Sequence, residues 1–274
     1  MGPKYEFTDM ILNWSGFLLH RIRRLSDGRL GGWIEKEENL SQEGKCWVSD
    51  EAKVYWGAKV YDNAKIHGNA EVYRDAKVYG NAEVYDNAKV DANACVYDNA
   101  KVYNSAEVDY YAKVHDNVKV YDEARVFDKT DISGDVEIYG GALIHGNAKV
   151  SDTAQVYDNT EVYDNAQIYD NAHVYGDAKV YGDAKVYGNA KVYGDESCVY
   201  DDAEVFGNAK VYDEAWVYEN AKVFGNTEVY GESQVYGKSQ VYGDAEVYGD
   251  AEVCGIARIG DGTYNSGVYN TADE

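Results

Sequence analysis

The amino-acid sequence predicts an all-β protein: a parallel β-helix of triangular cross-section, with about 12 coils of 18 residues and a small N-terminal β cap. Three observations lead to this fold class. An aliphatic residue returns at every sixth position from Val48 to Ile259, in 36 hexads with one extra residue between them. Alanine stands two residues before it in most hexads, and tyrosine follows it in 23 of them. Proline occurs once, at Pro3. Self-similarity at a fixed period is the sequence signature of a solenoid.

Residues 1–47 do not share this repeat and form the first expected domain, an N-terminal cap. Residues 5–8 and 17–25 are rich in aromatic and aliphatic side chains and predict short strands, followed by a turn at 26–28. A solenoid leaves a hydrophobic end open, and a cap must cover it. Trp14, Trp33 and Trp47 supply the bulk for this. The basic run at 20–24 fits either a solvated strand edge or an anion site.

The repeat itself is the second domain, residues 48–259. We number the aliphatic residue of each hexad as position 0, with alanine at −2, lysine, glutamate or glutamine at −1, and tyrosine at +1. Positions −2 and 0 share one face of a strand, so alanine and valine are expected inside and the other two outside. Glycine, aspartate and asparagine fill +2 and +3 and tolerate the left-handed backbone that a bend needs.

Three such bends close one coil of 18 residues, and parallel strands of successive coils pair about 4.8 Å apart. The extra residue lies within 194–197. We expect it to form a bulge at one corner that leaves the hexads on both sides in register. Residues 260–274 lose the repeat and are expected to form the third part, a C-terminal cap and an acidic tail.

One outward face is predicted to carry an unbroken file of tyrosines, because position +1 is tyrosine in ten successive coils. The tyrosine file consists of Tyr85, Tyr103, Tyr121, Tyr139, Tyr157, Tyr175, Tyr193, Tyr212, Tyr230 and Tyr248. On the other two faces the file is broken, by Asp91, Asp109, Phe127 and His145 on one of them. Stacked rings stabilise a β-ladder, and an aromatic strip is also a candidate partner surface, for a second copy in the first instance.

Acidic side chains gather at the bends and account for the net charge of −23. Residues 1–47 carry seven basic and seven acidic side chains, so the imbalance belongs to the repeat and tail. This argues against direct binding to nucleic acid or to a membrane, since both are anionic. Solubility of a repetitive β-protein and a DNA-like decoy surface both explain the charge. Candidate partner-binding acids are Asp86, Asp122, Glu123, Asp158, Asp201, Asp202, Asp213 and Glu214.

The hexad resembles the hexapeptide-repeat family, [LIV]-[GAED]-x-x-[STAV]-x, although tyrosine replaces the family's small or acidic residue after the aliphatic position. The segment 31–47, Gly-Gly-Trp-Ile-Glu-Lys-Glu-Glu-Asn-Leu-Ser-Gln-Glu-Gly-Lys-Cys-Trp, resembles the leader of YdcK-like proteins of bacterial and prophage reading frames. The resemblance implies a left-handed parallel β-helix. It also implies that acyltransferase and γ-type carbonic anhydrase activities must be considered.

No catalytic residue, cofactor or metal site is predicted from the residues present. The repeat contains no extruded loop of the kind that acyltransferases of this family use, and its histidines are not spaced to meet at one zinc ion. The four cysteines, Cys46, Cys95, Cys198 and Cys254, are far apart and are expected to be reduced thiols of a cytoplasmic protein.

The sequence therefore favours a non-catalytic acidic scaffold that binds a protein partner through its corners and tyrosines. In its sharpest form it is a phage-type DNA mimic that binds a nucleic-acid-binding or defence protein of the host. Alternatives are an acyltransferase-like enzyme and a purely structural or self-assembling spacer. The possible homo-oligomer uses the tyrosine-lined face.

Overall fold

A computed structural model describes residues 2–270 and divides the chain into two compact units, Met1–Gly134 and Asp135–Glu274. We call them unit 1 and unit 2 and describe each by itself. Among the described residues, strands account for all regular structure except one turn of 3₁₀-helix, η1 (Glu37–Asn39). The acidic end predicted for 271–274 lies outside the described residues.

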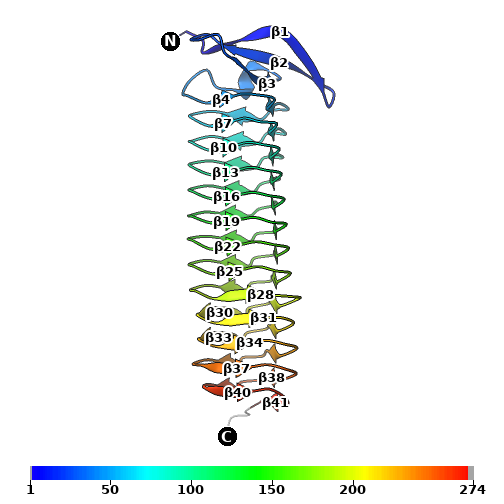
Figure 1. Cartoon of the computed structure of the whole chain (residues 1–274), viewed down its shortest axis with the longest axis vertical. Helices are drawn as coiled ribbons and strands as arrows, with labels where there is room; N and C mark the ends of the chain where they lie inside the picture. The colour runs from blue at the N-terminus through cyan, green and yellow to red at the C-terminus, as the bar shows by residue number, and fades with distance from the viewer. Residues whose placement is uncertain (1, 271–274) are drawn as a thin grey trace. The chain divides into compact units, whose positions relative to one another are not determined.

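The N-terminal cap of unit 1 is a twisted hairpin that continues into the first coil (Figure 1). Strands β1 (Tyr5–Trp14) and β2 (Phe17–Arg24) pair antiparallel, and β2 pairs antiparallel with β3 (Leu30–Ile34). β3 then pairs parallel with the first repeat strand, through Ile34 and Val54. Leu19, Trp33 and Tyr55 form the buried cluster under the hairpin, which is the covering function expected of this segment.

Three parallel sheets, A, B and C, form the sides of unit 1, and each coil adds one two-residue strand to each sheet. Sheet A contains β5 (Lys53–Val54), β8 (Glu71–Val72), β11 (Lys89–Val90), β14 (Glu107–Val108) and β17 (Arg125–Val126). Sheet B contains β6 (Lys59–Val60), β9 (Lys77–Val78), β12 (Cys95–Val96), β15 (Lys113–Val114) and β18 (Asp131–Ile132). Sheet C contains β4 (Trp47–Val48), β7 (Lys65–Ile66), β10 (Glu83–Val84), β13 (Lys101–Val102) and β16 (Lys119–Val120). Paired residues are 18 apart, as in Val84 with Val102.

Unit 2 repeats this arrangement. Its successive strands are assigned to sheets in the same repeating order along the chain as in unit 1, and the sheets keep the letters A, B and C. Sheet A contains β20 (Leu143–Ile144), β23 (Glu161–Val162), β26 (Lys179–Val180), β29 (Cys198–Val199), β32 (Trp216–Val217), β35 (Gln234–Val235), β38 (Glu252–Val253) and β41 (Val268–Tyr269). Sheet B contains β21 (Lys149–Val150), β24 (Gln167–Ile168), β27 (Lys185–Val186), β30 (Glu204–Gly207), β33 (Lys222–Gly225), β36 (Gln240–Val241) and β39 (Arg258–Ile259). Sheet C contains β19 (Glu137–Ile138), β22 (Gln155–Val156), β25 (His173–Val174), β28 (Lys191–Tyr193), β31 (Lys210–Tyr212), β34 (Glu228–Val229), β37 (Ala245–Val247) and β40 (Gly262–Tyr264).

The inside and outside of each coil follow the predicted alternation. Ala100 and Val102, at positions −2 and 0, have no exposed surface, whereas Lys101 between them is exposed. Aspartate and glycine at +2 adopt the left-handed backbone, with φ of 58° at Asp86 and 67° at Gly80. The fold class is thus confirmed in both units. The left-handed sense of the coil stays an expectation from the family resemblance.

The extra residue in unit 2 is absorbed at one corner, as predicted. Strands on the two sides of it pair with an offset of 19 instead of 18, for example Val180 with Val199 and Val192 with Val211. Glu196 takes a left-handed φ of 55° and lets the chain turn. Beyond Ile259 the coil continues: β40 and β41 pair parallel with β37 and β38. Parallel pairing therefore extends past both ends of the predicted range 48–259.

Candidate binding surfaces

The predicted tyrosine file exists within each unit. Tyr85, Tyr103 and Tyr121 stack in unit 1, with ring centroids 4.9 Å apart. In unit 2 the stack runs over seven rings, from Tyr139 to Tyr248, at 4.8–5.0 Å and with interplanar angles of at most 7°. The 18-residue count brings these side chains together because parallel strands place identical positions directly over one another.

Stacking limits what the tyrosines offer to a partner. Every ring of the file is half-buried between its neighbours, so ring faces are covered and ring edges and hydroxyls are exposed. Burial raises the pKa of Tyr157 to about 12, so the hydroxyl stays protonated at neutral pH. In unit 2 the other two sheets also carry stacked rings, such as Tyr163 on Tyr181 and Tyr169 on Tyr187. The file is therefore one of three ladders there, and its first role is structural.

Several of the predicted acidic residues accept hydrogen bonds from a neighbouring coil. Asp86, Asp158 and Asp201 each accept a backbone N–H from the next coil, at 3.4, 3.3 and 3.3 Å. Asp122 accepts from the Asn104 amide at 2.8 Å, and Asp202 accepts from the Asn220 amide at 3.2 Å. Glu123 is exposed. These carboxylates hold neighbouring bends together as well as contributing charge.

Asp213 and Glu214 differ, because they line a groove in unit 2 together with other acids. The groove has a volume of about 530 Å³ and is lined by Asp213, Glu214, Gly231, Glu232, Gly249 and Asp250, from three successive bends after sheet C. Within the described residues, none of its four carboxylates accepts a hydrogen bond or forms an ion pair. We call this site the acidic groove. At another corner of unit 2 the asparagines at position +3 form a ladder of side-chain hydrogen bonds. Asn189 donates to Asn208, and Asn208 donates to Asn226.

An exposed tryptophan borders the acidic groove. Trp216, the outward residue of β32, is 41% exposed. It lines a second hollow of about 210 Å³ with Glu214, Glu232 and Gln234, so the two depressions share two glutamates. An aromatic ring beside carboxylates is a favourable site for a cationic side chain, through cation–π and ionic contacts. Predicted tyrosines and acids thus meet here, since Tyr212, Tyr230 and Tyr248 precede the same three bends.

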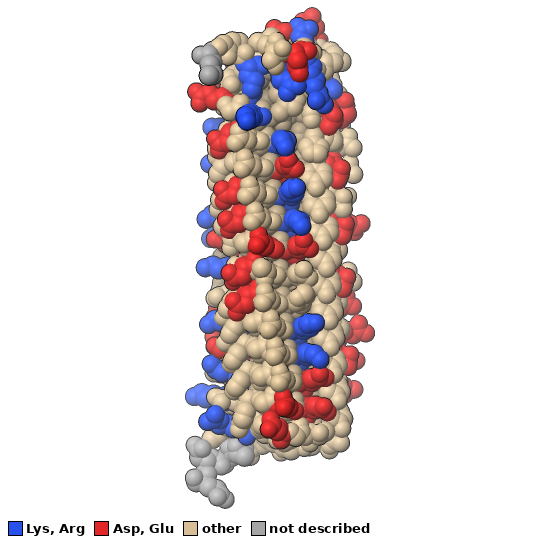
Figure 2. All heavy atoms as spheres, turned by 60° about the vertical axis from the view of Figure 1, so that its left-hand side comes forward, with Lys and Arg blue, Asp and Glu red and all other residues tan. Residues whose placement is uncertain are grey.

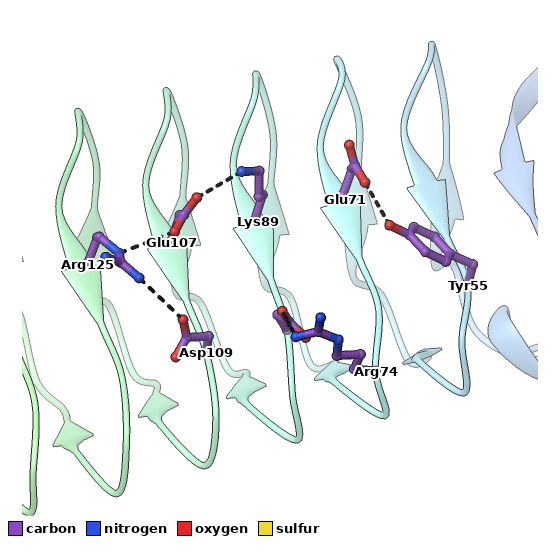
Figure 3. A network of polar contacts seen from close by, with 8 residues as sticks. Tyr55, Glu71, Arg74, Lys89, Glu107, Asp109 and Arg125 are labelled. Carbon is purple, nitrogen blue, oxygen red and sulfur yellow. Dashed lines mark hydrogen bonds and ion pairs between the residues drawn. The ribbon is translucent and has the colours of Figure 1, made fainter. Parts of the chain in front are cut away.

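A second cluster, in unit 1, was not predicted as a site. It lies where sheet A carries aspartate in place of the tyrosine at +1. Arg74 bonds Asp91 at 3.0 Å, and Arg125 approaches Asp109 at 3.8 Å and Glu107 at 3.2 Å (Figure 3). Asp91 is 8% exposed, and within the described residues one buried oxygen of Asp91 and one of Asp109 lack a hydrogen-bond partner.

The same corner of unit 1 departs from the repeat at its bend positions. Trp56, Tyr110 and Tyr111 stand where other coils have aspartate, glycine or asparagine, and they are 46–59% exposed. The Arg74 guanidinium lies over the Trp56 ring, 5.1 Å from its centroid. Aligning the sequence at its 18-residue period would have found this corner, because Trp56, Arg74, Ala92 and Tyr110 take the same position on four successive bends after sheet A.

Asp109 gives this corner a pH dependence. Burial raises its pKa from 3.8 to about 6; Arg125 opposes the rise, and Asp91, Glu107 and Asp128 add to it by repulsion. The folded unit therefore holds a proton that the unfolded chain loses between these values. This contribution to stability is fully present below about pH 4 and is lost as the pH rises through about 6.

We expect Asp109→Asn, which cannot titrate, to gain stability relative to the wild type as the pH rises from about 5 to about 7. Urea unfolding of both proteins across this pH range measures the difference in unfolding free energy. A difference that does not change with pH would contradict the raised pKa. Comparison with the variant cancels the pH response of the other carboxylates.

Three of the five histidines are part of the ladders. His67 stacks on Tyr85, His115 on Tyr97 and His145 on Tyr163, at 4.7–5.1 Å. His115 also lies 3.2 Å from Asp116 and 3.0 Å from Asp131. With Asp98 and Asp116 it presents three ligand atoms within 4.8 Å of one another, near the surface. Its ring nitrogens thus already face the carboxylates of Asp116 and Asp131.

Comparison with known proteins agrees with the repeat. Residues 166–182 match the family model described as the YdcK β-solenoid repeat, and they span β24, β25 and β26, one strand from each sheet of unit 2. A search of curated proteins found no match. None of the described residues forms a helix long and apolar enough to cross a membrane. With three sheets closed by 18-residue coils in each unit, this chain is a β-solenoid protein, and one of its coils, residues 166–182, matches the YdcK-type repeat.

Proposed function

We propose that this β-solenoid is a non-catalytic scaffold that binds a protein partner through its acidic corners and the tyrosines beside them. The observation that carries the proposal is the acidic groove of unit 2. Four carboxylates without partners stand together beside an exposed tryptophan and the edges of stacked tyrosines. Like charges held this close repel one another, and a cationic partner relieves that repulsion.

The partner is expected to present arginine or lysine side chains. Arginine suits both parts of the site, because its guanidinium bonds carboxylates and also stacks on an aromatic ring. Trp216 with Glu214 and Glu232 would take one such side chain, and Asp250 with Asp213 others. Such a scaffold would act in the cytoplasm, where its four cysteines, which form no disulfide, stay reduced.

The test is binding of a fluorescent oligo-arginine peptide, followed by anisotropy. Neutralising the groove with Asp213→Asn, Glu214→Gln, Glu232→Gln and Asp250→Asn is expected to weaken binding about tenfold or more. A control with four exposed acids elsewhere, Asp9→Asn, Glu43→Gln, Asp75→Asn and Asp195→Asn, changes the net charge equally and is expected to bind like the wild type. Equal loss in both variants would show that only net charge matters and would overturn the site.

A narrower form of the proposal is a DNA-like decoy for a nucleic-acid-binding protein of the host. The repeated corner acids favour it. On the face that Figure 2 shows, the acidic side chains do not stand alone, because lysine and arginine side chains lie in files beside them. The decoy form requires that the protein displace duplex DNA from a basic DNA-binding protein at low salt and release it at high salt, because charge mimicry is screened. Displacement that persists at high salt would count against it.

A further inference from the structure

Unit 1 carries a basic file that is the counterpart of the acidic groove. Lys59, Lys77 and Lys113 occupy the outward −1 position of β6, β9 and β15 in sheet B, and all three are exposed. Within the described residues, none of the three ammonium groups forms an ion pair or a hydrogen bond. We call them the lysine file.

The lysine file is costly in the isolated coil. Lys59 and Lys77 are directly paired residues of neighbouring parallel strands, and like charges in that position destabilise a sheet. Some paired positions of the repeat carry opposite charges, as where Lys65 bonds Glu83 at 2.6 Å and Lys89 bonds Glu107 at 2.8 Å, and others pair lysine with lysine, as Lys191 with Lys210. An anionic partner placed against the file would remove the repulsion.

The bends that precede the lysine file add aromatic area. Trp56, Tyr110 and Tyr111 lie on the chain just before Lys59 and Lys113, and Arg74 lies just before Lys77. This edge of unit 1 therefore combines unpaired cations with exposed rings, whereas the acidic groove of unit 2 combines unpaired carboxylates with the exposed Trp216. The two surfaces are complementary in charge, and both have an aromatic component.

Their spacing is also matched. The coils of both units rise by nearly the same amount, since stacked rings are 4.8 Å apart for Tyr61 and Tyr79 in unit 1 and 4.9 Å apart for Tyr212 and Tyr230 in unit 2. Lys59 and Lys77 are one coil apart, as are Glu214 and Glu232, and Glu232 and Asp250. The spacing of two side chains on one surface along the coil axis therefore matches that of two on the other.

We propose that the lysine file of one molecule binds the acidic groove of a second copy of this chain. The inference rests on the proposed function, in which the groove binds a cationic protein surface, and it names that surface. The contact joins two different surfaces, so it is heterologous and leaves each end of a pair free to bind another copy. Association then grows with concentration into open-ended chains. At about 0.15 M ionic strength the repulsion between the acidic molecules is screened beyond about 8 Å, whereas direct contacts persist.

Charge reversal on each side tests this directly by sedimentation velocity. The first variant is Lys59→Glu with Lys77→Glu and Lys113→Glu, and the second is Glu214→Lys with Glu232→Lys and Asp250→Lys. Both are compatible with the coil, because glutamate already occupies −1 at Glu71 and Glu83 and lysine already occupies +3 at Lys129 and Lys238. Circular dichroism checks that each variant is folded.

The wild type is expected to form concentration-dependent oligomers that dissociate at about 1 M salt, where the screening length is about 3 Å. Each variant alone is expected to be a monomer. In their mixture the intact groove of one variant meets the intact lysine file of the other, and the two reversed surfaces are also opposite in charge, so association is expected to return as alternating chains. A control with Lys149→Glu, Lys179→Glu and Lys238→Glu changes the net charge equally and should associate like the wild type.

A wild type that stays monomeric, variants that associate normally, or a mixture that stays monomeric would each overturn the inference. If the wild type is monomeric but the oligo-arginine peptide still binds the groove, this inference alone fails and the proposed function stands. If neither binds, both fail. Binding of a single-stranded oligonucleotide to a monomeric wild type, lost in the lysine variant, would reassign the lysine file to a polyanion.

Discussion

Val186→Asp is expected to unfold the coils around it, with a loss of more than about 4 kcal/mol in the free energy of unfolding. Val186 is fully buried in β27 and pairs with Ile168 and Val205 in the neighbouring coils. A carboxylate there would have no partner in a core built of valine and alanine. Because each coil is held mainly by its neighbours, the damage spreads along the stack.

The matched control is Lys185→Asp, one residue away on the same strand and pointing outward. Aspartate is natural at this position in β18, so the variant should lose no more than about 1 kcal/mol. Urea denaturation followed by circular dichroism compares the two. Similar losses in both variants would contradict the assignment of inner and outer positions.

The second large effect is expected from Tyr175→Ala, which interrupts a stack in unit 2. Tyr175 lies 4.8 Å from both Tyr157 and Tyr193, so the change removes two ring contacts. Aromatic pairs contribute about 0.5–1.5 kcal/mol each beyond area burial, which predicts a loss of at least about 1–3 kcal/mol. The lost contact of a half-buried ring adds to this.

Tyr175→Phe separates ring stacking from the hydroxyl group. Within the described residues the Tyr175 hydroxyl makes no hydrogen bond, so phenylalanine should match the wild type to within about 0.5 kcal/mol. The sequence itself makes this substitution at Phe206 and Phe224, whose rings stack 4.9 Å apart. Thermal or urea unfolding of the three proteins measures the difference. If alanine is tolerated as well as phenylalanine, the ladder is not a stabilising element.

Much of the candidate site could be predicted from position within the hexad, but its energetics could not. The sequence places Asp86 and Asp213 in equivalent corner positions, at +2 after a strand of sheet C. Only the structure shows that Asp86 accepts a backbone N–H from the next coil whereas Asp213, among the described residues, stands without a partner in a groove. The difference depends on what the next coil presents 18 residues later, at hydrogen-bond distance. The spacing of charged residues on one face follows from the 18-residue period. Whether two of them form an ion pair or a hydrogen bond depends on side-chain conformation.

The sequence by itself determined the coil: the period of six, the inward valine and alanine, the left-handed corner residues and the harmless extra residue near Glu196. These are local rules of strand alternation and backbone sterics, repeated often enough to leave one solution. Only the tertiary structure decided how the N-terminal hairpin covers the first coil, that pairing continues to Tyr269, and which charged side chains lack a partner. Those outcomes depend on contacts between residues distant in sequence and outside the repeat, for which the period carries no information.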